Sequence, residues 1–175
     1  AELNPNEEML ELINSFVFMN SDFQFFKDYL FLRTATQSNY DIEKLINYYY
    51  RISNDNDWQT LELAMTVAMK LYSQNENHEA LKFIENCCLS SLENSTDPIQ
   101  LFRYGILLER NDKITESEMI IQKSIDISDG SYPYILNYLA YLWVDNNRNL
   151  DLAENMLLKA VKDSDYQDGA ILDSL

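Results

Sequence analysis

The sequence predicts an all-α protein in which antiparallel helix pairs stack side by side into an α-α superhelix, or solenoid. Its 175 residues include only three glycines and three prolines, whereas β-rich folds use both residues freely in turns. Pro98 and Pro133 lie 35 residues apart and each opens an apolar run, as proline does at the first position of a helix. Apolar residues make up 46% of the chain, which is enough for a packed core.

Small residues recur in register along three successive segments, at a spacing of 35 to 37 residues. They form three columns when the segments are aligned: Ala68, Gly105 and Ala140; Ala80, Ser117 and Ala153; Cys87, Ser124 and Ala160. Larger apolar residues fill the positions between them: Val67, Tyr104 and Leu139; Leu71, Leu108 and Trp143; Ile84, Ile121 and Leu157. Each segment therefore predicts two helices, with small residues where the helix axes approach closely.

From Leu61 to Leu175 these columns resemble the tetratricopeptide repeat (TPR), a family of helix pairs that stack into a superhelix. The best-matching unit, Tyr134–Asp165, carries Leu136, Leu139, Ala140, Trp143, Ala153, Leu157 and Ala160, with one residue inserted in its corner. Asp129 and Asp165 depart from the pattern, which usually has proline there. Gly169–Leu175 is similar to the opening of a further unit in bacterial proteins of this family, so we expect the chain to be a fragment of a longer protein.

The first sixty residues are less regular but still predict helices. Pro5–Met19 and Asp22–Arg33 have helical apolar patterns, and Asp41–Ile52 follows as a third helix that Ser53–Asp57 breaks. We expect residues 1–58 to form a cap plus a degenerate repeat pair. Residues 59–175 are expected to form about three TPR-like units and the start of a further one.

The net charge of −16 restricts the kinds of partner. A surface this negative repels the phosphates of nucleic acids and of anionic membranes, so neither is expected as a partner. A basic protein could be attracted, although screening limits that attraction to about 8 Å at physiological salt. The alternative is that the charge only keeps the protein soluble. No apolar run approaches the ~20 residues that span a bilayer, so no membrane insertion is expected.

Cys87 and Cys88 are adjacent within a helical apolar pattern. Neighbouring residues on a helix point about 100° apart, so we expect no disulfide between them and predict that both thiols are buried and reduced. Reduced thiols favour the cytoplasm. The opening Ala1-Glu2-Leu3 leaves a removed leader or anchor open, so a periplasmic or membrane-anchored parent is the alternative.

The resemblance implies that the first helix of each unit lines a concave groove through positions 2, 5, 9 and 12 of the repeat. Helical spacing independently places these positions on one face. The residues are Glu62, Met65, Met69, Tyr72, Ile99, Phe102, Ile106, Glu109, Tyr134, Asn137, Tyr141 and Val144. This apolar face with a carboxylate rim could hold an amphipathic helix or an extended apolar peptide. Alternatively, it packs against the N-terminal helices or a second protomer.

Some TPR proteins bind the terminal carboxylate of a peptide with Lys, Arg and Asn on this face. Only Asn137 matches that pattern here, so this subclass is not expected.

No catalytic residue, cofactor or metal site is predicted. His78 lies in a polar corner. Asp145–Asp151 resembles a calcium loop, but Leu150 stands where the turn needs glycine, and Met156 where a bidentate glutamate belongs. We therefore expect a non-enzymatic scaffold that binds another protein or a peptide in the groove. The alternative is a structural module that supports another domain of a longer chain, or that forms a homo-oligomer through its exposed last helix.

Overall fold

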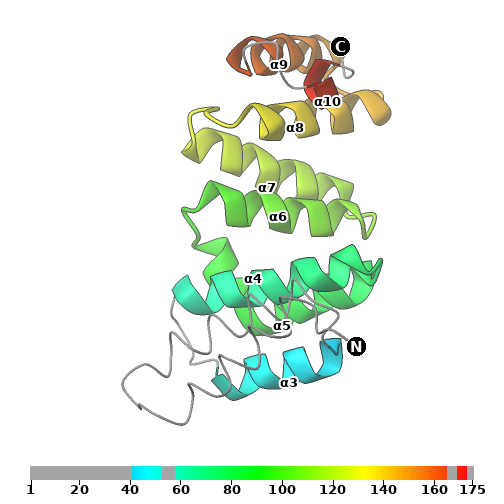
Figure 1. Ribbon diagram of the computed structural model, residues 1–175. Helices are drawn as coiled ribbons and strands as arrows, with labels where there is room; N and C mark the ends of the chain where they lie inside the picture. The colour runs from blue at the N-terminus through cyan, green and yellow to red at the C-terminus, as the bar shows by residue number, and fades with distance from the viewer. Residues whose placement is uncertain (1–40, 53–57, 165–168, 173–175) are drawn as a thin grey trace, which may run out of the picture. The chain divides into compact units, whose positions relative to one another are not determined.

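The computed structural model describes residues 41–52, 58–164 and 169–172, and every regular element in these ranges is an α-helix (Figure 1). The helices predicted at Pro5–Met19 and Asp22–Arg33 lie outside the described residues, as does the break at Ser53–Asp57. The third predicted helix is present, and the Asp41 carboxylate caps it by accepting from the N–H groups of Glu43 and Lys44 at 3.0 and 3.3 Å. Of the helices described, none has both the length and the apolar character to cross a bilayer.

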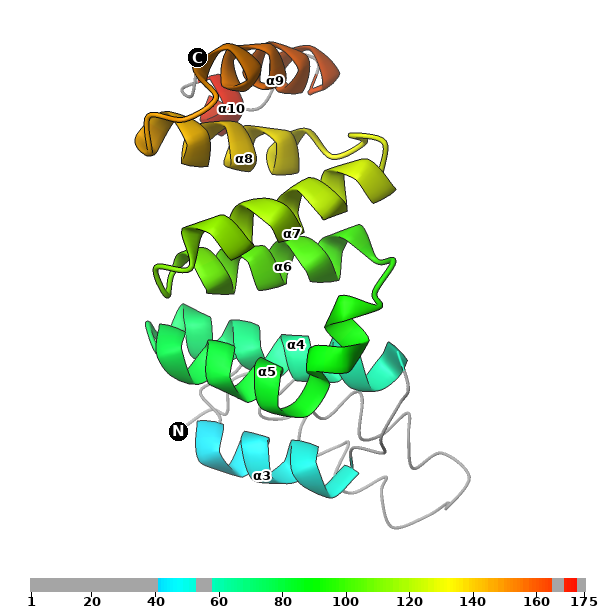
Figure 2. The same cartoon turned by 180° about the vertical axis from the view of Figure 1, so that it is seen from behind.

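The chain consists of two compact units, Ala1–Glu93 and Asn94–Leu175, which we call the first and the second unit. The first contains α3 (Ile42–Ile52), α4 (Trp58–Ser73) and α5 (Asn77–Glu93). The second contains α6 (Pro98–Glu109), α7 (Ile114–Ile127), α8 (Pro133–Asp145), α9 (Leu150–Asp163) and the short α10 (Gly169–Leu172). Within the second unit, α6 to α9 follow one another as successive layers (Figures 1 and 2). The predicted change from a cap to regular repeats near residue 58 remains a prediction.

Two hydrogen bonds show how the helices of one pair are arranged. Ser124 Oγ, near the end of α7, donates to the carbonyl oxygen of Pro98 at the start of α6, at 2.7 Å. Ser117 Oγ, near the start of α7, donates to the carbonyl oxygen of Gly105 at 2.8 Å. The two helices are therefore antiparallel, and small side chains stand where their axes approach. A Cβ atom on Gly105 would run into Ile121 Cγ1, which explains why glycine occupies this position.

The corners inside the three helix pairs share one backbone feature where the first helix ends. In each, one residue takes the left-handed conformation that Asn and Asp tolerate: Asn75 (φ 64°), Asp112 (φ 61°) and Asn147 (φ 52°). The N–H of the next residue then donates to the carbonyl oxygen five residues earlier: Glu76 to Leu71, Lys113 to Leu108 and Arg148 to Trp143, at 3.1, 3.0 and 2.8 Å. This bond satisfies one of the free carbonyls at each helix end.

The predicted small-residue columns are buried with one exception. Ala68, Ala80, Ala140, Ala153 and Ala160 have no exposed surface, and Ser117 and Ser124 are equally buried. Cys87 is only half-buried, contrary to the prediction, whereas Cys88 is buried. The backbone of Cys88 leaves the helical region (φ −140°, ψ 16°), so α5 is broken at this point.

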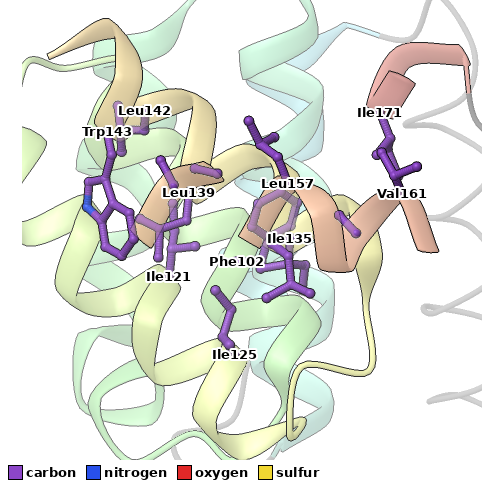
Figure 3. Packing of buried hydrophobic residues seen from close by; sticks show 14 residues of the cluster. Phe102, Ile121, Ile125, Ile135, Leu139, Leu142, Trp143, Leu157, Val161 and Ile171 are labelled. Atoms are coloured by element: carbon purple, nitrogen blue, oxygen red, sulfur yellow. The ribbon is translucent and has the colours of Figure 1, made fainter. Parts of the chain in front are cut away.

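The core of the second unit joins all five of its helices (Figure 3). Phe102 and Ile121 come from the first pair, Leu139 and Leu157 from the second, and Ile171 from α10. Ile171 is only 3% exposed. The helix predicted to open at Gly169 is therefore present and packed on the preceding pair.

Candidate protein-binding surface

The predicted groove residues of the second unit lie on α6 and α8, and we call them the candidate surface. They are Ile99, Phe102, Ile106 and Glu109 on α6, and Tyr134, Asn137, Tyr141 and Val144 on α8. Tyr134, Tyr141 and Val144 are 41%, 52% and 44% exposed. The other face of α8 is buried, so α8 carries a core face and a solvent face, both largely apolar.

Aromatic contacts bring the two helices of the candidate surface together. The ring of Phe102 on α6 lies edge-on to those of Tyr134 and Tyr138 on α8, with centroid separations of 5.5 and 5.2 Å. The ring centroid of Tyr132 lies 5.7 Å from that of Tyr134. Phe102 is only 8% exposed, so it forms the base of the surface and Tyr134 the solvent side. Sequence reasoning missed Tyr138, although it follows Tyr134 by four residues and therefore lies one helical turn away.

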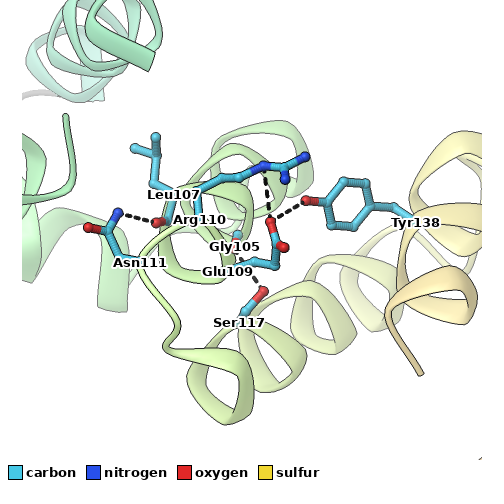
Figure 4. A network of polar contacts seen from close by, with 7 residues as sticks. All are labelled: Gly105, Leu107, Glu109, Arg110, Asn111, Ser117 and Tyr138. Atoms are coloured by element: carbon cyan, nitrogen blue, oxygen red, sulfur yellow. Dashed lines mark hydrogen bonds and ion pairs between the residues drawn. The ribbon is translucent and has the colours of Figure 1, made fainter. Parts of the chain in front are cut away.

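A carboxylate at the end of α6 is bound to α8 (Figure 4). Tyr138 Oη donates to Glu109 Oε2 at 3.1 Å, and Arg110 Nε lies 3.2 Å from the same oxygen. The side chains of Arg110 and Glu109 are 48% and 20% exposed, and ion pairs this exposed contribute little stability. The predicted acidic rim is therefore partly neutralised at Glu109.

Asn137 carries an unsatisfied polar atom in the middle of the α8 face. Its Oδ1 is buried and has no hydrogen-bond partner among the described residues. A buried acceptor without a partner costs about 1–3 kcal/mol. Beside it, burial and the neighbouring Tyr132 raise the pKa of Tyr134, which keeps its hydroxyl a neutral donor and acceptor.

The other predicted groove residues lie on α4 of the first unit. Met65 has no exposed surface, and Glu62, Met69 and Tyr72 are half-buried. Met65 is therefore a packed residue in the chain as described. These four side chains belong to a different compact unit from the candidate surface.

His78 and Asp145–Asp151, which the sequence analysis did not assign to a catalytic or metal site, lie at a helix start and in a corner between helices. His78 is exposed at the start of α5. Asp145–Asp151 contains the corner between α8 and α9, in which Asn147 and Asn149 both take left-handed conformations. Among the residues described, no three His, Cys, Asp or Glu side chains are grouped as metal ligands would be.

Antiparallel helix pairs, small residues at their contacts and similar corners define a TPR-like helical solenoid. MamA from Desulfovibrio magneticus RS-1 superposes with a TM-score of 0.70 at 14% identity, over 94% of this chain and 88% of that one. BtubC from P. vanneervenii has a TM-score of 0.69 at 12% identity, over 94% and 72% of the two chains.

A third similar structure is PlcR from Bacillus thuringiensis, in complex with the peptide PapR7 and DNA. Its TM-score is 0.66 at 15% identity, over 97% of this chain and 65% of that one. No protein-family model matches the sequence, and no curated protein matches it in sequence. At these identities the similarity establishes the all-α TPR-like fold.

Proposed function

We propose that this chain is a non-enzymatic scaffold that binds a segment of another protein on the candidate surface. The observation that carries the proposal is the solvent face of α8, where Tyr134, Tyr141 and Val144 are 41%, 52% and 44% exposed. Tyrosine is enriched at protein interfaces because it buries a large area while its hydroxyl stays hydrogen-bonded.

The chemistry of this surface favours an apolar peptide with basic flanks. The aromatic and aliphatic side chains would cover one face of an amphipathic helix or the alternate side chains of an extended strand. The net charge of −16 favours Lys or Arg at the ligand's ends and disfavours nucleic acid. Glu62, Met69 and Tyr72 on α4 are the corresponding predicted groove positions of the first unit.

The comparison structures are compatible with this role. PlcR, which shares the fold, is seen with a bound peptide as well as DNA. This chain covers 65% of PlcR. A peptide is therefore the kind of ligand that we carry over to the present chain, and DNA is not, because of the charge.

A second candidate function is self-association. Leu150, Leu152 and Leu158 on α9 are 52%, 56% and 52% exposed, and one or more of these apolar side chains could contact a second copy of the chain. In that case the chain would be a structural module that pairs with its own copy or supports another domain. Sedimentation over a range of concentrations separates the two functions, because a peptide-binding scaffold stays monomeric.

The experiment that tests the proposal is selection of peptides from a random library on the immobilised chain, followed by measured affinities for variants. Tyr141→Ala should weaken the selected peptides by about tenfold or more, since interface aromatics commonly contribute more than 1 kcal/mol. Leu152→Ala removes an equally exposed apolar side chain from α9 and should leave affinity unchanged. Equal effects of the two substitutions, or loss of helicity in Tyr141→Ala, would contradict the proposed surface.

A further inference from the structure

The solvent face of α8 has the residue spacing of a coiled-coil seam. Steps of three, four and three residues separate its candidate-surface positions, which are Tyr134, Asn137, Tyr141 and Val144. At about 100° per residue these positions lie within about 80° of one another, so they form one narrow stripe. Three of the four side chains are exposed, and Asn137 is half-buried. Alternating steps of three and four residues are the a/d pattern by which one helix packs along another.

The distance between the exposed rings suits a helical ligand better than an extended one. Tyr134 and Tyr141 are seven residues apart, which is about 10.5 Å along the axis of α8. Equivalent positions in successive heptads of a partner helix repeat at the same distance. Side chains on one face of an extended strand repeat at about 6.4–6.8 Å, so a strand that lies along α8 does not match both rings.

The candidate surface also offers few hydrogen bonds to the backbone of a ligand. Each residue of an extended peptide has an N–H and a C=O group that need partners when they are buried, and strand addition supplies them from a sheet edge. Every regular element in the described part of this chain is a helix. Glu109, the one carboxylate of the surface, already accepts from Tyr138 and pairs with Arg110. A ligand helix does not need such partners, because it hydrogen-bonds its own backbone.

The charge at one end of α8 determines where the basic residues of a ligand belong. Asp145, the last residue of α8, is exposed, and its carboxylate adds to the partial negative charge at the C-terminal end of the helix. Two arginines at this end are held in ion pairs, Arg110 with Glu109 and Arg148 with Glu118, at 3.2 and 2.9 Å. A cationic side chain from a ligand is therefore complementary to this end of the surface.

Building on the binding role proposed above, we propose that the candidate surface binds a basic amphipathic α-helix of another protein, packed along α8. Apolar side chains of the ligand at a and d positions contact Tyr134, Tyr141 and Val144. Lys or Arg in one terminal turn of the ligand lies over Asp145. The stripe on α8 is about 15 Å long, so about three turns of the ligand are in contact. A helix this short is marginal in water and forms fully only when it is bound.

The test uses two synthetic peptides of fifteen residues with the same content of leucine, alanine and lysine. One has leucine at the heptad a and d positions and lysine in its last turn, and the other has leucine at every second position. Calorimetric titration of the full chain should show that the heptad peptide binds at least about tenfold more tightly, because only this peptide presents a single apolar face as a helix. Tyr141→Ala should weaken that binding by about tenfold, whereas Leu152→Ala on α9 should leave it unchanged.

Proline substitutions in the heptad peptide test its conformation directly. Proline at a central position that faces away from α8 should weaken binding by about a hundredfold, because it breaks the helix. Proline at the first position should have little effect, since a helix tolerates it there. Circular dichroism should show a gain of helix when the unsubstituted peptide is mixed with the chain.

Replacement of the lysines by glutamate tests the charge assignment, and Asp145→Asn is the matched change on the protein. The peptide change should weaken binding, and Asp145→Asn should reduce the preference for lysine by about two- to fivefold, as is usual for exposed charges.

Equal affinities for the two leucine patterns, or binding that survives the central proline, would overturn the helical ligand. If Tyr141→Ala still weakened that binding, the proposed surface itself would stand. Binding that does not depend on Tyr141 would instead contradict the surface. A dimer of the free chain that Tyr141→Ala dissociates in sedimentation would assign the surface to a second copy and would also overturn the proposed partner.

Discussion

Ser117 Oγ donates a hydrogen bond of 2.8 Å to the carbonyl oxygen of Gly105, across the closest approach of α6 and α7. The serine is completely buried, and the glycine leaves room for the side chain of Ile121. The contact between α6 and α7 thus combines a small polar residue, Ser117, with a glycine, Gly105. The geometry of this pair depends on both.

Gly105→Ala should destabilise the second unit by about 1–3 kcal/mol, because the added Cβ would collide with Ile121 and force it to move. Urea unfolding followed by circular dichroism measures the change. Gly169→Ala is the matched control, since a Cβ at that position meets no atom within 4 Å. Similar stabilities of the two variants would show that the close approach of α6 and α7 is wrong.

Ala153→Leu should cost about 1–3 kcal/mol through overpacking, because Ala153 has no exposed surface in the contact between α8 and α9. Glu154→Leu changes the neighbouring exposed position and should remain within about 0.5 kcal/mol of the unmodified chain. Thermal unfolding of both variants tests the register of the repeat. An unchanged melting temperature for Ala153→Leu would contradict that register.

Phe102→Ala should reduce stability by about 3–5 kcal/mol, because the ring is buried between Tyr134 and Tyr138. Tyr141→Ala removes a ring that is 52% exposed and should change stability far less. Denaturant unfolding of the two variants therefore separates the base of the candidate surface from its solvent side. A larger loss for Tyr141→Ala would reverse that assignment.

The stability of the first unit should rise as the pH increases from 7 to 9, through the thiol of Cys88. Its pKa is lowered to about 7 in the fold, so the contribution is complete above the ordinary thiol value and is lost as the pH falls through about 7. Above pH 9 the trend reverses, because burial and the neighbouring thiols raise the pKa of Tyr49 and of Tyr50, and hydrogen bonding to Cys88 raises that of Cys87. Urea midpoints of the unmodified chain and Cys88→Ser between pH 7 and 9 measure the effect, and parallel curves would contradict it.

The fold was predictable because its determinants are local in sequence. The recurring Ala, Gly and Ser residues marked the helix contacts, and Asn and Asp marked the corners. The break at Cys88 was not predictable, since the residues around it continue a helical apolar pattern.

The candidate surface was predictable only as a helix face. Helical periodicity places Phe102 and Tyr141 on the groove-facing side of their helices. It does not show that neighbouring side chains cover Phe102, whereas Tyr141 is exposed. The bond from Tyr138 to Glu109 joins residues 29 positions apart. Such contacts depend on how successive pairs stack, which the pattern of a single helix does not contain.

The corners of the three helix pairs close with main-chain hydrogen bonds, and each requires only one or two residues that accept a left-handed backbone. Side chains on the solvent faces take no part in them. Mutations that change ligand specificity therefore fall largely at other positions than mutations that change the conformation of the corners. A scaffold of this kind can change most of its residues and keep its fold, as the superposition of this chain on MamA at 14% identity illustrates.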